Sequence, residues 1–198
     1  MGQAGMAEAA VRYLRSVGSA RPVEPLPRPD LRCVGEDERA PVGQGDFRRV
    51  LGSFATGVAV VTAPAADGES GPAGFACQSF SSLSLDPPLV TFMVGRTSAT
   101  WPRIARAGVF CVNVLAAHQG ALCRGFAVSG ADKFAGVAYD AAPCSGSPRL
   151  AETLAWIDCT IHAVHTGGDH LIVVGRVDAL GTGDEDAAPL LFHRGRFL

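Results

Sequence analysis

The sequence predicts a mainly β, antiparallel fold for residues 45–198, and three observations lead to this prediction. Strand-like runs, most of them apolar, recur at 58–63, 75–84, 89–94, 109–115, 153–165 and 170–179. Turn-forming residues separate most of these runs, as in the Gly- and Pro-rich segment 65–72. The last two runs flank Thr166-Gly167-Gly168-Asp169, which has the chemistry of a hairpin turn. Adjacent runs joined by short turns favour antiparallel pairing.

Composition limits what the protein does. A chain of 198 residues with 47% hydrophobic content can bury the core of one domain. The net charge of −2 gives no electrostatic footprint for nucleic acid or an anionic membrane, so neither partner is expected. No apolar run approaches the roughly 20 residues that span a bilayer, and the N-terminus lacks the apolar block of a signal peptide. We therefore expect a cytoplasmic protein.

Residues 1–44 differ from the rest and are interpreted as an N-terminal extension. The Ala-rich piece from Ala4 to Val17 favours a short helix that Gly18 would end. The following segment, 21–41, carries five prolines among charged residues, which is typical of an extended, partly mobile linker. The domain is expected to occupy 45–198.

The expected helices lie between the strands. Asp46 is a fair N-cap for a helix that ends near Gly57 and faces the core with apolar residues at three- and four-residue steps, namely Phe47, Val50, Leu51 and Phe54. The segment 118–128 predicts a second short helix, followed by a loop at 129–146. Asp86-Pro87-Pro88 must mark a sheet edge or a bend, because proline has no N–H to donate.

The segment 96–108, RTSATWPRIARAG, combines a third helix with a candidate anion site. Ser98 or Thr100 can cap this helix, Pro102 suits its first turn, and Gly108 can end it. Unpaired N–H groups at a helix N-terminus favour phosphate, and the two hydroxyls would add donors. The alternative is ordinary capping by serine and threonine.

Cysteine and histidine spacing indicates neither disulfides nor a metal. The six cysteines form no C-x-x-C pair, and several lie in apolar strand patterns that are typical of buried free thiols. His162 and His165 would face opposite sides of one strand. No Gly-x-Gly-x-x-Gly loop, P-loop or G-x-S-x-G elbow is present either.

The segment 74–88, GFACQSFSSLSLDPP, is unusually polar for a strand. Its serines surround Phe75, Phe80 and Leu83, whereas a core strand would favour Val or Ile. Hydroxyls and small residues suit phosphate oxygens and the polar rim of a heterocycle. A solvent-facing strand rich in serine is the alternative.

Several segments in order resemble the flavin reductase-like family of FMN-binding split-barrel proteins. They are FATGVAVVT at 54–62, SFSSLSLDPPLV at 79–90, RTSATW at 96–101, GDH at 168–170 and LLFHRGRF at 190–197. The resemblance implies an antiparallel split β-barrel of six or seven strands with a few flanking helices. It also implies a homodimer, because family members commonly build the flavin site at or near the subunit interface.

The resemblance further implies an NAD(P)H:flavin oxidoreductase that supplies reduced flavin to a partner monooxygenase by diffusion or transient contact. FAD is favoured over FMN and NADH over NADPH. A flavin-binding or electron-transfer protein without turnover is the alternative of another class, and a purely structural barrel is a third. The residues alone do not choose between them.

Site residues are carried over from matching positions. His170 is the catalytic candidate, expected to orient the nicotinamide or to stabilise an anionic flavin, while a polar edge residue is the alternative. The expected cofactor contacts are Ala76, Cys77, Gln78, Ser79, Ser82, Ser84, Ser98, Thr100, Lys133, Phe134, Asp169 and Phe197. Lys133 could instead be a solvated loop residue. Two departures are Cys77-Gln78, where Ala-Asn is commoner, and Phe197, where many members carry tyrosine.

Overall fold

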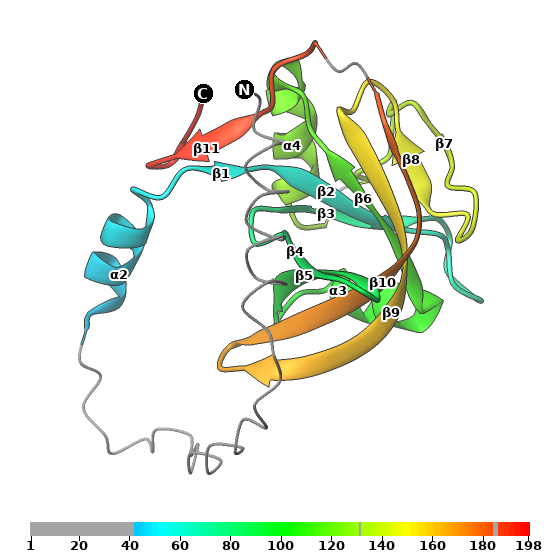
Figure 1. The fold of residues 1–198 in the computed structure, drawn as a ribbon, viewed down its shortest axis with the longest axis horizontal. Helices are drawn as coiled ribbons and strands as arrows, with labels where there is room; N and C mark the ends of the chain where they lie inside the picture. Colours follow the sequence, from blue (N-terminus) through cyan, green and yellow to red (C-terminus); the bar gives the residue numbers. More distant parts are fainter. Residues whose placement is uncertain (1–41, 131, 184–185) are drawn as a thin grey trace, which may run out of the picture. The chain divides into compact units, whose positions relative to one another are not determined.

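A computed structural model describes residues 42–130, 132–183 and 186–198 (Figure 1). The expected helix at 4–17 and the Pro-rich segment at 21–41 lie outside these residues.

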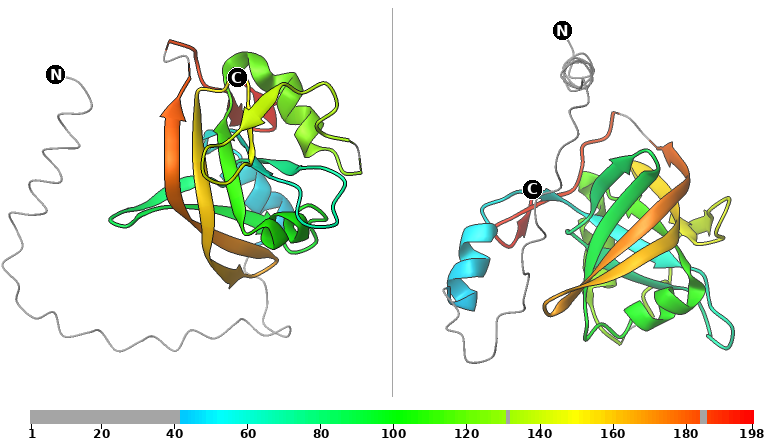
Figure 2. Two further views of the ribbon diagram at one scale, coloured as in Figure 1. Left: turned by 90° about the vertical axis from the view of Figure 1, so that its right-hand side faces the viewer. Right: turned by 60° about the horizontal axis from the view of Figure 1, so that its bottom comes forward.

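One seven-stranded antiparallel sheet forms the body of the domain, as predicted. Its spatial order is β3-β2-β6-β9-β10-β5-β4. The strands are β2 (Ala59–Ala63), β3 (Ala73–Cys77), β4 (Ser81–Leu85), β5 (Pro88–Gly95), β6 (Val109–Val114), β9 (Ala155–Gly167) and β10 (His170–Thr182). The long hairpin β9–β10 turns at Gly168-Asp169, where the sequence predicts it. Figure 2 shows these strands curving around a common interior.

Shorter elements surround this sheet. A three-stranded sheet has the order β1-β11-β12 (Thr56–Gly57, Leu191–His193, Arg196–Phe197), and β7 pairs with β8 (Tyr139–Ala141, Pro148–Leu150). The helices are α2 (Gln44–Leu51), α3 (Trp101–Ala107) and α4 (Gly120–Ala127), with a 3₁₀ turn at Ala117–Gln119. The expected loop at 129–146 therefore contains one short strand.

The sheet buries side chains on both faces of β2, which explains why four of its five residues are apolar and all five are buried. Val61 joins a cluster inside the curved sheet that includes Phe92 and Phe110, whereas Val60 packs in a second cluster with Phe126 of α4. The rings of Phe92 and Phe110 meet edge to face, with centroids 5.2 Å apart. One face of β2 thus packs against the interior of the curved sheet, and the other face packs against α4.

The prediction of one strand at 75–84 is wrong, because the chain leaves the ladder at residues 78–80. The Ser79 side chain replaces the missing backbone partner: its hydroxyl donates to the Met93 carbonyl and accepts from the Met93 N–H, both at 3.0 Å. Beyond this break, β4 continues as an edge strand and turns back into β5 at Asp86-Pro87. The prolines thus mark an edge and a bend, as predicted.

The prediction that the first helix faces the core is also wrong. Helix α2 starts after Gly43 rather than at Asp46, ends at Leu51, and contains no buried residue. Its apolar side chains and the nearby Phe54 are all more than half exposed, namely Phe47, Val50, Leu51 and Phe54. Apolar periodicity correctly predicted a helix, but it does not specify that the apolar face packs within the same chain.

A fully buried polar cluster joins β8 to β2 and β6; we call it the Asn113 cluster, formed by Thr62, Asn113 and the backbone of Pro148 and Leu150. The Asn113 amide donates to the carbonyls of Val60 and Pro148, at 3.2 and 3.3 Å, and its oxygen accepts from the Leu150 N–H at 2.8 Å. The Thr62 hydroxyl donates to the Pro148 carbonyl at 2.5 Å. Both side chains are 0% exposed, so these bonds satisfy groups that water cannot reach.

Among the residues with described positions, no helix is both long and apolar enough to cross a membrane.

Candidate functional site

A cavity of about 650 Å³ lies where five segments of the domain meet; we call it the main cavity. The end of β3, the end of β5, the loop 96–100, the end of α4 and the first residue of β10 all contribute to it. Its lining includes eight of the predicted site residues, namely Ala76, Cys77, Gln78, Ser79, Ser98, Thr100, Lys133 and His170. Residues separated by almost a hundred positions in sequence are thus brought together.

The other predicted residues lie elsewhere. Phe134 lines a neighbouring cavity, and Asp169 hydrogen-bonds His170 from the adjacent position. Ser82 and Ser84 are on β4, beyond the break at Ser79, and do not line the main cavity. Phe197 also lies outside it, where its ring packs 5.4 Å from that of Phe192.

The loop 96–100 presents free backbone donors to the main cavity. The Ser98 N–H bonds the Gly95 carbonyl at 2.9 Å, and the Ser98 hydroxyl accepts from the Trp101 N–H at 3.2 Å. Ser98 is therefore the residue that caps α3, whereas the Thr100 side chain makes no capping bond. Within the described part of the chain, the N–H groups of Thr97, Ala99 and Thr100 donate no hydrogen bond. Such a set of converging donors suits the oxygens of a phosphate.

Most of the polar groups at the end of β3 bond to one another. The Ser79 hydroxyl is fully used by Met93, and the Cys77 sulfur lies 3.4 Å from it. Burial raises the pKa of the Cys77 thiol, so this residue remains protonated and neutral near pH 7. Gln78 makes only a long contact of 3.5 Å with Thr56. The side chains on this side of the main cavity are therefore uncharged and mostly small, which suits the face of a flat heterocycle.

His170 enters the main cavity from the β9–β10 turn in a fixed orientation. Its Nδ1 lies 2.7 Å from Oδ1 of Asp169, and this bond holds the pKa of the Asp169 carboxyl below its usual range. The turn is itself tied to the loop 96–100, because the Arg96 N–H donates to the Asp169 carbonyl at 3.0 Å. The imidazole is half exposed, and its Nε2 remains the nitrogen available to a ligand.

Lys133 also lines the main cavity. Its ammonium donates to the carbonyl oxygens of Gly74 and Phe126, at 3.1 and 3.0 Å. Partial burial, together with the nearby charge of Arg103, lowers the pKa of Lys133. The alternative of a freely solvated loop lysine is therefore wrong: this ammonium connects β3, α4 and the following loop.

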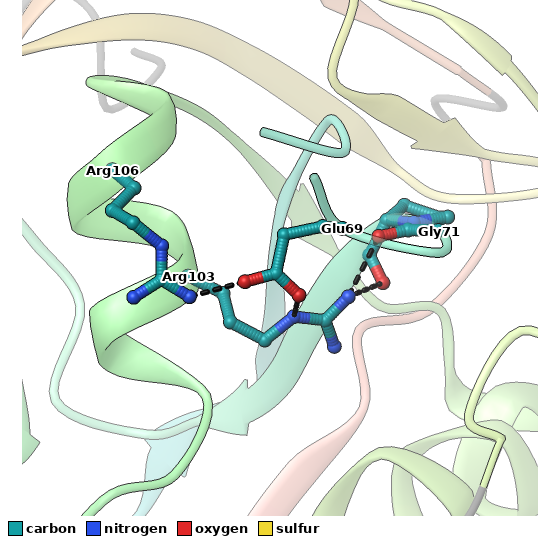
Figure 3. A network of polar contacts seen from close by, with 5 residues as sticks. Glu69, Gly71, Arg103 and Arg106 are labelled. Atoms are coloured by element: carbon teal, nitrogen blue, oxygen red, sulfur yellow. Dashed lines mark hydrogen bonds and ion pairs between the residues drawn. The ribbon is translucent and has the colours of Figure 1, made fainter. Parts of the chain in front are cut away.

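A second cavity of about 550 Å³ adjoins the first and shares Ala99, Thr100, Gly130 and Lys133 with it. Arg103 of α3 lines only this second cavity. Figure 3 shows its guanidinium held by the loop before β3: Nε donates to Glu69 at 3.0 Å, and Nη2 donates to the carbonyls of Gly71 and Pro72 at 2.6 and 3.2 Å.

The same carboxylate bonds a second arginine. Arg106 donates to the other oxygen of Glu69, and the hydrogen bond from Arg106 is the main cause of a lowered pKa for that carboxyl, to which Arg103 adds. The two ion pairs of Glu69, with Arg103 and Arg106, thus fix the position of α3 against the loop 69–72 (Figure 3).

Sequence reasoning missed several lining residues. Met93 and Gly95 lie at the end of β5, and Phe126, Ser129 and Gly130 at the end of α4. The first two are adjacent to the quoted segment 96–101, which was a usable signal. The last three had none, because their position depends on how α4 packs on β3: a Cβ at Gly74 would come within 2.8 Å of the Phe126 ring.

The described groups suit a ligand that combines a flat heterocycle with a phosphate. The loop 96–100 supplies the anion donors, residues 76–79 supply a small neutral surface, and His170 supplies a ring nitrogen. A flavin mononucleotide unit has this chemistry.

Comparisons with known proteins agree with this chemistry. Residues 51–198 match the family described as flavin reductase like domain. The chain is 50% identical over 151 residues to the reductase subunit HsaB of a flavin-dependent monooxygenase from Rhodococcus jostii, covering 76% of this chain and 75% of the relative. It is 46% identical over 166 residues to a flavin reductase from Pseudomonas putida, covering 84% and 95%.

Solved structures show the same relationship. Nitrilotriacetate monooxygenase component B from Mycobacterium thermoresistibile is 47% identical, with a TM-score of 0.73 and coverage of 78% of this chain and 85% of that one. The NADH:FAD oxidoreductase SgcE6 from Streptomyces globisporus, in complex with NAD and FAD fragments, is 38% identical, with a TM-score of 0.72 and coverage of 78% and 90%. The chain therefore belongs to the flavin reductase-like family.

Proposed function

We propose that this protein is an NAD(P)H:flavin oxidoreductase that supplies reduced flavin to a partner monooxygenase. The observation that carries the proposal is the main cavity, where free backbone donors, a small neutral surface and His170 converge. Relatives named as flavin reductases and as the reductase subunit of a monooxygenase support it. Nothing in the site favours a carrier without turnover.

The residues of the main cavity would divide the work of binding. The N–H groups of the loop 96–100, with Ser98 and Thr100, would hold the flavin phosphate, and residues 76–79 would lie along the ring. A bound flavin supplies a ring that accepts hydride from NAD(P)H. His170 would then accept a hydrogen bond at Nε2 from the NH2 group of the nicotinamide carboxamide, because its Nδ1–H is donated to the Asp169 carboxylate, which holds the imidazole in place.

Lys133 would stabilise the reduced flavin by its positive charge and would not transfer a proton or hydride. Lys133 lines the main cavity, and a positive charge there would stabilise a reduced, anionic flavin. Its two hydrogen bonds to backbone carbonyls keep it in place without a ligand. Such preorganisation limits the reorganisation that binding requires.

We also propose a homodimer in which a second copy covers the apolar side of α2. More than half of the Phe47, Leu51 and Phe54 side chains is exposed in one chain, which is costly for neighbouring large apolar residues. Sedimentation equilibrium should give a dimer, and Phe47→Glu should give a monomer. The control Leu180→Glu changes an exposed apolar residue on β10 and should leave the dimer intact. A monomeric wild type would contradict this part of the proposal.

The proposed activity is tested by NADH and NADPH oxidation with FAD or FMN added to the purified protein. Turnover that requires flavin is expected, with NADH as the better donor. Flavin binding without oxidation of either nucleotide would instead indicate a non-catalytic flavin protein, and absence of binding would indicate a structural barrel. Delivery of reduced flavin is then measured with the monooxygenase on the other side of a dialysis membrane, where product formation indicates diffusion and its loss indicates contact.

A further inference from the structure

We propose that the second cavity holds the adenylate half of FAD, so that this protein prefers FAD to FMN. The inference rests on the proposed function, because it places the flavin ring and first phosphate in the main cavity. The two cavities meet at Thr100, Gly130 and Lys133, beside the free N–H groups of the loop 96–100. FMN ends at its phosphate, whereas FAD continues from that point with a second phosphate and an adenosine.

The charges around the junction favour a second phosphate. Arg103 and Lys133 both line the second cavity, and they lie close enough for the guanidinium to lower the pKa of the lysine. Like charges held together repel, and an anion bound between them would relieve the repulsion. The Lys133 ammonium keeps one N–H after its two bonds to carbonyls, whereas Arg103 keeps both N–H groups of Nη1.

Arg103 has one nitrogen free for a ligand. Nε is used by Glu69, and Nη2 is used by Gly71 and Pro72. Nη1 makes no bond with the described residues, and Figure 3 shows it without a dashed line. The other three contacts hold the guanidinium rigidly, so a phosphate oxygen can be met without the usual loss of side-chain freedom.

The remaining lining suits a nucleoside. Asp132 also lines the second cavity; its Oδ1 accepts from the Phe134 N–H at 3.2 Å, and its Oδ2 can accept from a ribose hydroxyl or an adenine amino group, whereas a phosphate would be repelled. Phe134 adds an aromatic surface whose ring is fixed edge to face against Phe126, with centroids 5.1 Å apart. The donors at one end and the acceptors at the other thus follow the order of groups along an adenylate.

Arg106 provides a matched control for Arg103. Both arginines lie on α3 and bond the same carboxylate, but only Arg103 lines the cavity. We would titrate FAD and FMN against the wild type, Arg103→Met and Arg106→Met, following flavin fluorescence, with thermal unfolding as a check of the fold. One charge-assisted hydrogen bond changes a dissociation constant by about tenfold or more.

The wild type is expected to bind FAD about tenfold more tightly than FMN. Arg103→Met should remove most of this preference and leave FMN affinity within about twofold, because FMN does not reach Nη1. Arg106→Met should change neither. Equal wild-type affinities, or equal losses for both flavins in Arg103→Met, would overturn the inference while leaving the flavin reductase function intact. Failure of both flavins to bind the wild type would overturn both proposals.

NADH also carries an adenylate, so its use of the second cavity must be distinguished. With FMN as the flavin, the KM for NADH should be the same in Arg103→Met and wild type. A raised KM would assign the second cavity to NADH and overturn the FAD assignment.

Hydrogen exchange of the wild type tests the location if Arg103→Met does not fold. Both flavins should slow exchange of the amides at Thr97, Ala99 and Thr100. Only FAD should slow exchange at Gly71 and Asp132. Equal protection of these two amides by FAD and FMN would contradict the proposal.

Discussion

The Asn113 cluster and the main cavity are both rich in polar groups, but they differ in whether those groups are paired. In the Asn113 cluster, Asn113 and Thr62 are 0% exposed and both side chains bond neighbouring protein groups. In the main cavity, the N–H groups of Thr97, Ala99 and Thr100 and Nε2 of His170 have no partner among the described residues. Paired, buried polar groups stabilise a fold, whereas unpaired groups that converge on a cavity are available to a ligand.

The largest expected effect is on the Asn113 cluster. Asn113→Leu leaves the Leu150 N–H and the Val60 carbonyl without their side-chain partner, so we expect a loss of about 3–5 kcal/mol in the free energy of unfolding. Urea denaturation measures it. Flavin affinity of the folded fraction should be unchanged. A loss of flavin affinity with normal stability would break the distinction between the two regions.

His170→Ala tests the proposed role of His170 in flavin reduction. Loss of this positioned hydrogen bond should raise the barrier to flavin reduction by about 2–4 kcal/mol, with little change in flavin affinity or stability. Anaerobic single-turnover bleaching of flavin absorbance isolates this step. His165→Ala, on the same hairpin but outside the main cavity, is the matched control. A wild-type reduction rate would remove His170 from the mechanism and direct attention to the segment 193–197.

Thr100→Ala should act on binding alone. Its hydroxyl makes no bond to the described residues, so its loss should weaken flavin binding by about 1.5–3 kcal/mol if it meets phosphate, and leave stability nearly unchanged. Adding Ser98→Ala should weaken binding further and also lower stability by about 1 kcal/mol, because Ser98 caps α3. Ser82→Ala, outside the main cavity, is the control. An unchanged dissociation constant in the double variant would refute the phosphate assignment.

Removal of residues 1–40 is expected to have the smallest effect. Both polar regions lie within residues 42–198, and the Pro-rich segment has few apolar residues with which to stabilise a core. The shortened protein should fold and retain its reductase activity. A large loss in unfolding midpoint would show that the extension packs on the domain.

Sequence patterns predicted the strands and turns of the fold better than the side-chain hydrogen bonds that join distant segments. Strand β2 and the β9–β10 hairpin follow from local apolarity and turn chemistry, because both are properties of neighbouring residues. The strand break at 78–80 could not be predicted, since a serine hydroxyl there replaces a backbone partner. The partner of Asn113 was equally hidden, because Pro148 and Leu150 are 35 and 37 positions away in the sequence.

The candidate site was predicted best where ligand-facing residues are contiguous. Residues 76–79, with Ser98 and Thr100, line the main cavity as short runs. The serines of β4 lie outside it, because β4 begins after the break at 78–80 and forms the edge strand of the sheet. Arg103 had no local signal, since an arginine on a short helix is usually solvated.

The bond between Ser79 and Met93 gives the protein an internal reporter. A single hydroxyl stands where the ladder between β4 and β5 would otherwise continue from Ser81 and Thr91 to Met93, and it borders the main cavity. The amide hydrogen of Met93 is therefore shielded by a rotatable side chain rather than by a neighbouring strand. A thermal fluctuation or a bulky ligand that separates Ser79 from Met93 would therefore expose the Met93 amide hydrogen to solvent. The backbone pairs of the rest of the sheet would stay intact.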